Sequence, residues 1–450
     1  MIRSIRWRGA WVLVGLLFCQ TLAPSARGLD VEHQAIAREA IEQGLAYLRQ
    51  TQAADGSWSP RPGPAITGLI VTAMLDQPDI DAADPTVAKG LEYILSKVQA
   101  DGSIRDGAEG ILANYNTAIC LSALARVHDN PEIAAVVAGA QAFLKDLQWN
   151  VGDVTPAGET ITSGHPFVGG AGYGRHGRPD MSNTQFMLQG LYDSGVDCDD
   201  PAFQAAVRFI GRCQGIEEND YFPAGTIVND GGIIYATSIN GQHPEIPVSY
   251  ANPEAVDEAR AGRPVSGLRG YGSMTYAGFK SFLYANLDRD DPRVRGALSW
   301  IENHYTLEQN PGMPEPVARQ GLYYYYLTHA RALAAWGNTY LTVSDGQKIA
   351  KITVGASAET QEVFRLITQY QARGYEVDLV TVGGEDAPKK IDVQEVNAPR
   401  EIDWANKLIA KLASLQQADG SFVNDEGRWM ENDADLVTAY SVLALQAAAN

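Results

Sequence analysis

The sequence predicts an all-α protein, an (α/α)6 double-ring toroid with a small α/β insert. Two kinds of helical pattern alternate along the chain. One kind has a single apolar stripe, as at Ile41, Leu45 and Leu48, and is typical of a half-exposed amphipathic helix. The other kind is apolar or small on nearly every side, which indicates a helix buried all round. The alternation occurs six times and favours a closed double ring over an open helical solenoid.

The six pairs can be placed along the chain. Four of the amphipathic helices begin near a proline that follows Asp or Asn, as expected of an N-cap and a first-turn proline. The amphipathic stripes lie at 41–48, 87–98, 133–147, 203–210, 294–305 and 404–415. The buried runs lie at 65–75, 116–127, 183–192, 274–285, 321–336 and 436–449.

One short motif occurs three times where an amphipathic helix should end, as DGSW, DGSI and DGSF. Its glycine, which is Gly56, Gly102 or Gly420, can take the left-handed conformation that stops a helix. The bulky apolar residue that follows can then pack against neighbouring helices. These copies indicate repeated turns that connect outer helices to inner ones.

The first copy, Gln52 to Trp58, resembles the QW repeat of terpenoid cyclases, whereas the other two copies replace the tryptophan. The double ring resembles the superfamily of terpenoid cyclases and protein prenyltransferases, and in particular its secreted bacterial prenyltransferase and squalene cyclase repeat proteins. The resemblance covers roughly residues 30–340 and 401–450. It implies that the glutamine and tryptophan tie adjacent helix ends together, and it guides the fold more than the reaction.

The chain divides into three predicted parts. Residues 1–28 carry three arginines before a short apolar run and small residues, which predicts a signal peptide and a secreted or periplasmic protein. Residues 29–340 and 401–450 form the toroid. Residues 341–400 contain β-branched runs on either side of a helical pattern, which predicts an inserted βαββ module that serves as a surface for protein contact.

Composition excludes several classes of partner. The formal net charge is -19, and no basic cluster occurs outside the N-terminus, so nucleic acids and anionic lipid surfaces are poor partners. After removal of the signal peptide no stable membrane span is expected. The sequence shows no metal-binding motif, and we expect no metal, no cofactor and no disulfide.

The longest loops all connect an outer helix to an inner one, and therefore lie on one face of the ring. They are residues 152–182, 215–272, 306–319 and 418–432. The N-termini of the inner helices open on the same face. We expect the functional mouth there, because functional residues concentrate on loops that a rigid scaffold carries.

The segment from Trp429 to Tyr440 contains Asp433-Ala-Asp435 at the start of the last inner helix. It resembles the D-x-D-D-T-A motif of squalene-hopene cyclases and related class II terpene cyclases. The resemblance implies that Asp435 is the general acid and Asp433 its partner. Leu436 stands at the third aspartate position, and the Thr-Ala pair is shifted by one. The alternative is that these aspartates cap the helix.

A second catalytic hypothesis involves Tyr325 and His329, which lie four residues apart on the fifth inner helix. Such a pair can do acid–base work. The four tyrosines at 323–326 cover all sides of this helix, so one or two of them must face the central cavity. The alternative for His329 is an ordinary buried core residue.

The polar loop at 164–183 can bind an anionic or sugar-like ligand, or can simply pack over the ring. We take its polar residues and one aromatic residue of the last long loop as candidate substrate-binding residues. They are His165, Tyr173, His176, Asp180, Asn183 and Trp429.

Three functions remain open. The protein is a cyclase-like isomerase or lyase that protonates a polyprenoid or other apolar substrate, a non-catalytic module that binds a small molecule, lipid, glycan or protein, or a glycan-active toroid. The last would need two facing carboxylates. A deep aromatic pocket would favour the first, a plugged centre the second and a shallow polar cleft the third.

Overall fold

The computed structural model of this chain describes residues 29–59, 61, 63–107, 112–127, 129–174, 177–355, 360–373, 375–382 and 391–450. The predicted signal peptide and His176 lie outside the described residues.

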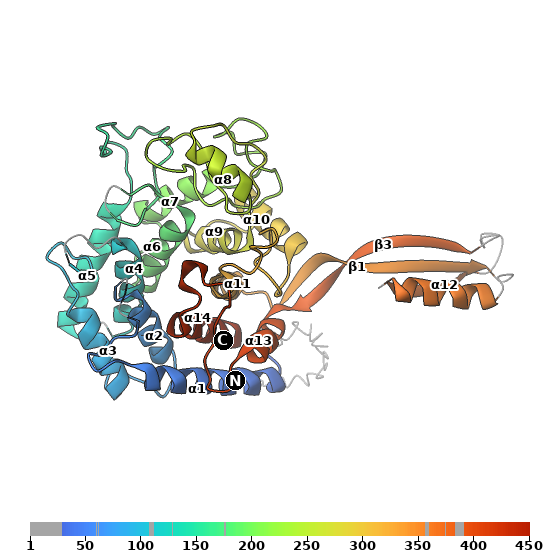
Figure 1. Ribbon diagram of the computed structural model, residues 1–450, viewed down its shortest axis with the longest axis horizontal. Coiled ribbons are helices and arrows are strands. Elements are labelled where there is room, and N and C mark those ends of the chain that lie inside the picture. Colours follow the sequence, from blue (N-terminus) through green and yellow to red (C-terminus); the bar gives the residue numbers. More distant parts are fainter. Residues whose placement is uncertain are drawn as a thin grey trace, which may run out of the picture.

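Six helices form an inner ring (Figure 1). Each packs against the next in chain order, and the last packs against the first, so the ring is closed. Their residues are buried on nearly every side, as the apolar runs predict. The inner helices are α2 (Ala65–Leu75), α4 (Ala113–Leu124), α6 (Met181–Asp193), α9 (Gly272–Tyr284), α11 (Leu322–Trp336) and α14 (Ala434–Ala449).

Six outer helices pack against this ring, and the predicted all-α toroid is confirmed. In four of them an Asp or Asn side chain accepts a hydrogen bond from a first-turn backbone N–H and a proline follows, as expected. The outer helices are α1 (Val31–Thr51), α3 (Pro85–Leu95), α5 (Pro131–Leu147), α7 (Pro201–Arg212), α10 (Pro292–His304) and α13 (Trp404–Leu415).

A glutamine at the end of four outer helices ties each turn to the next outer helix. The Gln52 amide donates to the carbonyl of Gly56 at 3.1 Å and to that of Thr86 in α3 at 2.9 Å. Gly56 has a φ of 87° and lies against the backbone of α3, where a Cβ would clash, so the position requires glycine. The corresponding pairs of hydrogen bonds are made by Gln148, Gln214 and Gln416.

A threonine near the start of five inner helices holds the other side of these turns. The Thr67 hydroxyl accepts a hydrogen bond from the backbone N–H of Trp58 at 3.1 Å. The Trp58 indole is buried and donates to the carbonyl of Leu48 at 2.6 Å. The threonine bonds tie the start of each of these five inner helices to the turn that precedes it. The equivalent threonines are Thr117, Thr184, Thr275 and Thr438.

Between α11 and α13 the chain leaves the ring and forms the arm on the right of Figure 1. It contains β1 (Tyr340–Gly355), α12 (Thr360–Ala372), β2 (Glu376–Val382) and β3 (Asp392–Asp403). In the sheet β1 is central, with β2 parallel to it and β3 antiparallel to it. The division of the chain into domains stays a prediction.

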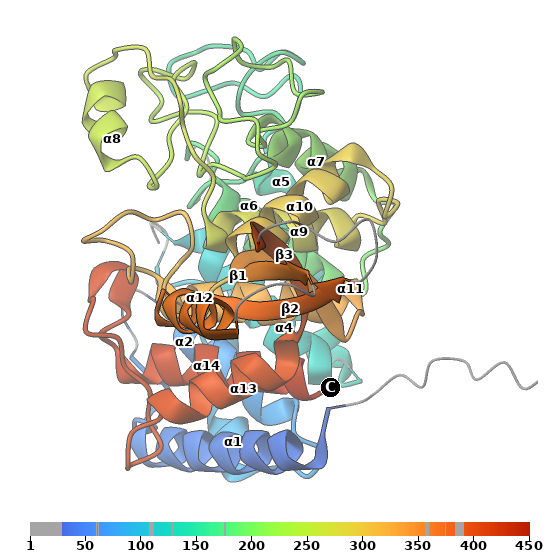
Figure 2. The same ribbon diagram turned by 90° about the vertical axis from the view of Figure 1, so that its right-hand side faces the viewer.

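The long loops and the short helix α8 (Pro253–Arg260) gather at one end of the ring, and the C-terminus lies at the other (Figure 2). Cys120, Cys198 and Cys213 are free thiols. No helix in the described ranges has the length and apolar character needed to cross a membrane.

Candidate functional site

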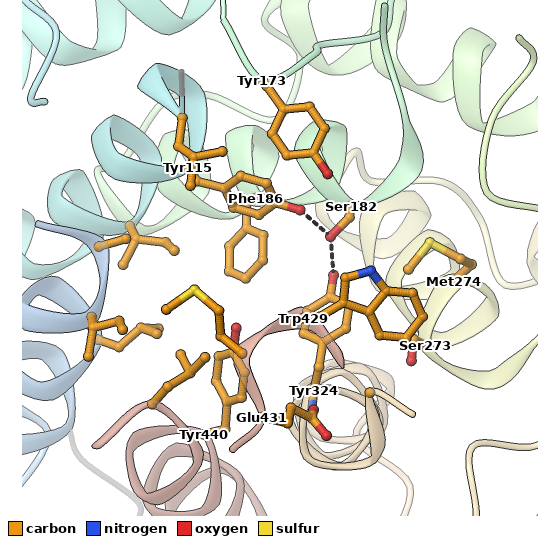
Figure 3. A pocket seen from close by; sticks show the side chains of 18 of the residues that line it. Tyr115, Tyr173, Ser182, Phe186, Ser273, Met274, Tyr324, Trp429, Glu431 and Tyr440 are labelled. Atoms are coloured by element: carbon orange, nitrogen blue, oxygen red, sulfur yellow. Dashed lines mark hydrogen bonds between the residues drawn. The ribbon is translucent and has the colours of Figure 1, made fainter. Parts of the chain in front are cut away.

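A cavity of about 230 Å³ lies in the centre of the inner ring, at the long-loop end (Figure 3). All six inner helices contribute their N-terminal residues to its wall. The mouth is therefore on the face that the loop lengths predict. Among the described residues no group of three His, Cys, Asp or Glu side chains is placed to hold a metal ion.

The lining is mostly aromatic and aliphatic. Phe186 is central: its ring centroid lies 5.2 Å from that of Tyr115 and 5.8 Å from that of Tyr324, over which it stacks. The aliphatic part of the wall includes Ile66, Leu69, Ile119 and Leu436. The aromatic residues of the lining are Tyr115, Tyr173, Phe186, Tyr235, Tyr271, Tyr324, Trp429 and Tyr440.

A short 3₁₀ turn at Arg428–Met430 carries Trp429 to the cavity. Trp429 and Met430 have φ values of 56° and 66°, which are rare for residues with a side chain and mark a strained backbone. Gly321, at the start of α11, faces the Trp429 ring, and a Cβ there would lie 3.1 Å from it. The close approach of the indole thus depends on this glycine.

Glu431 is the one carboxylic acid among the described residues that line the cavity. One of its oxygens accepts a hydrogen bond from the backbone N–H of Tyr324 at 2.8 Å, and the other accepts from the Asn424 amide at 2.7 Å. Glu431 thereby caps α11, whose N-cap residue is a glycine. Burial raises the pKa of Glu431 to about 7, although these hydrogen bonds favour the carboxylate. Near neutral pH both the acid and the carboxylate are therefore present.

Asp435 does not belong to the lining of the cavity. Its two oxygens accept hydrogen bonds from the hydroxyls of Thr51 at 2.7 Å and Ser59 at 3.2 Å, at the end of α1 and in the following turn. Burial raises the pKa of Asp435, the Thr51 hydrogen bond opposes the shift, and the nearby charge of Asp433 adds to it. Asp433 caps α14 by accepting from the backbone N–H of Leu436. The role of Asp435 as an acid stays a prediction, and its position gives that role no support.

Tyr325 and His329 are fully buried and do not line the cavity either. The Tyr325 hydroxyl donates to the carbonyl of Thr306 at 2.7 Å, and no hydrogen bond joins it to His329. Neither ring nitrogen of His329 has a hydrogen-bond partner in the described part of the chain. The imidazole packs among aromatic rings, including that of Tyr276 at 5.0 Å between centroids. Burial lowers the pKa of His329 to about 3. The alternative of a core histidine fits these surroundings.

Two of the candidate substrate-binding residues, Tyr173 and Trp429, line the cavity. His165 is buried against the Phe167 ring, outside the cavity. Asp180 is fully buried and caps α6 by accepting from the backbone N–H of Asn183 at 2.9 Å and from its side-chain amide at 2.9 Å. The structure therefore gives Asp180 and Asn183 a structural position; their substrate-binding role is untested.

Sequence reasoning missed most of the wall. Phe186 lies in an ordinary helical run, Tyr115 directly precedes the run at 116–127, and Tyr440 ends a segment that is distinguished only by its aspartates. Ser182 lies within the polar loop at 164–183 but is not one of the candidate substrate-binding residues. Of the tyrosines at 323–326, Tyr324 is the one in the lining, in agreement with the expectation that one or two of them face the cavity. The helix rotation that selects these residues has no local signature.

No family model matches this chain, and no curated protein matches it. Solved structures of the type II terpene cyclase MstE from Scytonema are similar to it. A variant of MstE in complex with geranylgeranyl dihydroxybenzoate (substrate) is 11% identical, with a TM-score of 0.49, over 94% of this chain and 99% of that chain. The apo MstE structure is 12% identical, with a TM-score of 0.31, over 92% and 98%. At these values the likeness says nothing of the substrate of this chain.

Proposed function

We propose that this protein binds an apolar, chain-like ligand in its central cavity. The observation that supports the proposal is the aromatic and aliphatic lining at the mouth of the ring. Aromatic side chains offer large apolar contact area, and their faces also attract cations. Ligand pockets usually measure roughly 300–1,000 Å³. A cavity of about 230 Å³ therefore takes a small apolar molecule or one end of a longer chain, such as a prenyl group.

Filling the cavity should strongly weaken ligand binding. Ala65 is half-buried at the start of α2 and lines the cavity, so the indole of Ala65→Trp would occupy space that the ligand needs. We expect isothermal titration calorimetry with farnesol to show binding to the wild-type protein and an affinity about a hundredfold lower for the variant, a loss of about 3 kcal/mol.

Ala138→Trp is the matched control, because Ala138 is exposed on the outer helix α5. It should leave farnesol binding unchanged. Equal binding by the wild-type protein and Ala65→Trp would show that the ligand sits elsewhere and would refute the proposal.

Catalysis is the second candidate function, and the position of Glu431 favours it. In this scheme the Glu431 proton adds to an alkene carbon, which leaves a Glu431 carboxylate and a carbocation near the aromatic wall. Loss of a proton from another carbon then gives an isomer or a cyclised product of unchanged mass. With a pKa of about 7, part of the Glu431 carboxyl groups are protonated near neutral pH and can donate.

Glu431→Gln should lower the rate of such a reaction by about 10²–10⁴, while Asp435→Asn should retain it. Products from a panel of linear polyprenols would be separated and identified by mass spectrometry. The wild-type rate should fall as the pH rises through about 7, because only the protonated acid can donate. Loss of the reaction in Asp435→Asn alone would return the role to Asp435, and its absence from the wild-type protein would leave binding as the function.

The glycan-active alternative receives less support. Hydrolysis of a glycosidic bond uses two facing carboxyl groups, whereas the described lining offers Glu431 alone. Asp180 and Asp433 are engaged as helix caps. Export to the periplasm or the medium remains our proposal from residues 1–28 of the sequence.

A further inference from the structure

Three hydroxyl groups form a chain of hydrogen bonds in the wall of the cavity (Figure 3). The Tyr115 hydroxyl donates to the Ser182 hydroxyl at 2.6 Å. The Ser182 and Tyr324 hydroxyl oxygens are 3.0 Å apart. The Gln185 side-chain amide also donates to the Tyr324 hydroxyl, at 2.9 Å. The Tyr324 oxygen is therefore the last member of this chain of hydrogen bonds, and its two polar neighbours are Ser182 and Gln185.

The orientation of the Gln185 amide is fixed from behind. Its carbonyl oxygen accepts a hydrogen bond from the Lys280 amine at 2.8 Å, which leaves its NH₂ group to face Tyr324. Lys280 is fully buried and donates also to the carbonyl oxygen of Gln189 at 2.6 Å. The buried lysine, which otherwise lies unexplained inside the ring, therefore helps to position the hydrogen-bond donor of Gln185.

Counting the hydroxyl protons shows that this chain of hydrogen bonds lacks one acceptor. Each hydroxyl supplies one proton and can also accept. The Tyr115 proton goes to Ser182, and the contact between Ser182 and Tyr324 uses one more. The third proton has no acceptor among the described residues. If Ser182 donates its proton to Tyr324, Ser182 both accepts from Tyr115 and donates to Tyr324. The hydroxyl proton of Tyr324 is then left without an acceptor and can point into the cavity.

We propose that Tyr324 donates this hydrogen bond to an uncharged acceptor oxygen of the ligand, such as a ketone, ester or ether oxygen. The inference rests on the proposed binding function and narrows it to apolar chains that carry one such oxygen. A phenol that accepts two hydrogen bonds is a stronger donor than one that accepts none. The ligand oxygen is uncharged, because the carboxylate form of Glu431 at the same wall disfavours an anion.

Tyr440 provides the matched control. It lines the same wall, with its ring centroid 6.0 Å from that of Tyr324, and its hydroxyl makes no hydrogen bond to the described part of the protein. Tyr440→Phe and Tyr324→Phe therefore each remove one phenolic hydroxyl from the same surface. Only Tyr324→Phe removes the last hydroxyl of the chain of hydrogen bonds.

The test compares geranylacetone with the hydrocarbon of the same carbon skeleton by equilibrium dialysis. For each probe the affinity of a variant is divided by that of the wild-type protein, so that differences in water solubility cancel. Tyr324→Phe should lower the affinity for geranylacetone about tenfold, and should leave the affinity for the hydrocarbon unchanged or raise it. Ser182→Ala should lower the affinity for geranylacetone about threefold. Tyr324 then accepts one hydrogen bond in place of two, and its hydroxyl becomes a weaker donor to the ligand. Tyr440→Phe should change the affinities of the two probes by the same factor, because the Tyr440 hydroxyl does not belong to this chain of hydrogen bonds.

The outcomes separate this inference from the proposed function. If Ala65→Trp strongly weakens binding of both probes but Tyr324→Phe weakens neither, the cavity is the binding site and the role of Tyr324 is wrong. Equal weakening of both probes by Tyr324→Phe would also overturn it, since that result would reflect altered packing. If Ala65→Trp changes neither probe, the proposed binding function itself fails.

Discussion

Replacing Asp180 with alanine is expected to lower the free energy of unfolding by about 3 kcal/mol. Asp180 is fully buried at the start of α6 and accepts two hydrogen bonds from Asn183. Without the carboxylate, the backbone N–H and the side-chain amide of Asn183 lose these acceptors in a place that water does not reach. A buried donor left unpaired costs about 1–3 kcal/mol. The nearby Arg178 would also lose an attractive charge.

Urea unfolding of Asp180→Ala beside Asn130→Ala would measure this difference. Asn130 caps the outer helix α5 but is exposed, so its loss should cost only about 1 kcal/mol. Asp180→Asn should fall between the two, because it keeps one acceptor oxygen. If Asp180→Ala were as stable as the wild-type protein yet lost ligand binding, Asp180 would be a substrate-binding residue after all.

The second large effect concerns pH and His329. Burial lowers the pKa of His329 from its ordinary value of 6.5 to about 3. Between these values the unfolded chain binds a proton that the folded chain does not bind. The contribution of His329 to the free energy of unfolding is therefore unaffected above about pH 6.5 and becomes unfavourable as the pH falls. At pH 4.5 it should lower the free energy of unfolding by about 3 kcal/mol relative to pH 7.

His329→Phe should remove this pH dependence, because phenylalanine fits an aromatic environment and carries no titrating group. The quantity to measure is the difference in unfolding free energy between variant and wild-type protein at pH 7 and at pH 4.5. Other groups, including Glu431 with its raised pKa, cancel in that difference. We expect the variant to gain about 3 kcal/mol relative to wild type over this interval. A constant difference would mean that folded His329 takes up protons normally, and would reopen its acid–base role.

The predicted catalytic site and the observed cavity differ for a structural reason. The motif resemblance drew attention to Asp435, which starts an inner helix as the pattern requires, but its carboxylate bonds to Thr51 and Ser59. Glu431 lies four residues before Asp435, in a loop. A loop has no helical or strand period from which the direction of a side chain could be predicted. That loop folds back onto the start of α11, and the carboxylate of Glu431 reaches the cavity wall through its bond to Tyr324. Neighbours so distant in sequence cannot be inferred from spacing.

The sequence by itself determined the double ring, the helix starts and the left-handed turns. The spacing of the apolar residues within a helix indicates which of its faces are buried. Caps and glycines affect only the few residues next to them, so all these signals are local in the sequence. Only the tertiary structure decided which side chains meet in the centre. The rotation of each inner helix about its axis, set by packing against the neighbouring helices, turned Tyr324 toward the cavity and Tyr325 away from it. The candidate site is therefore a property of the closed ring, and no single segment of the chain contains it.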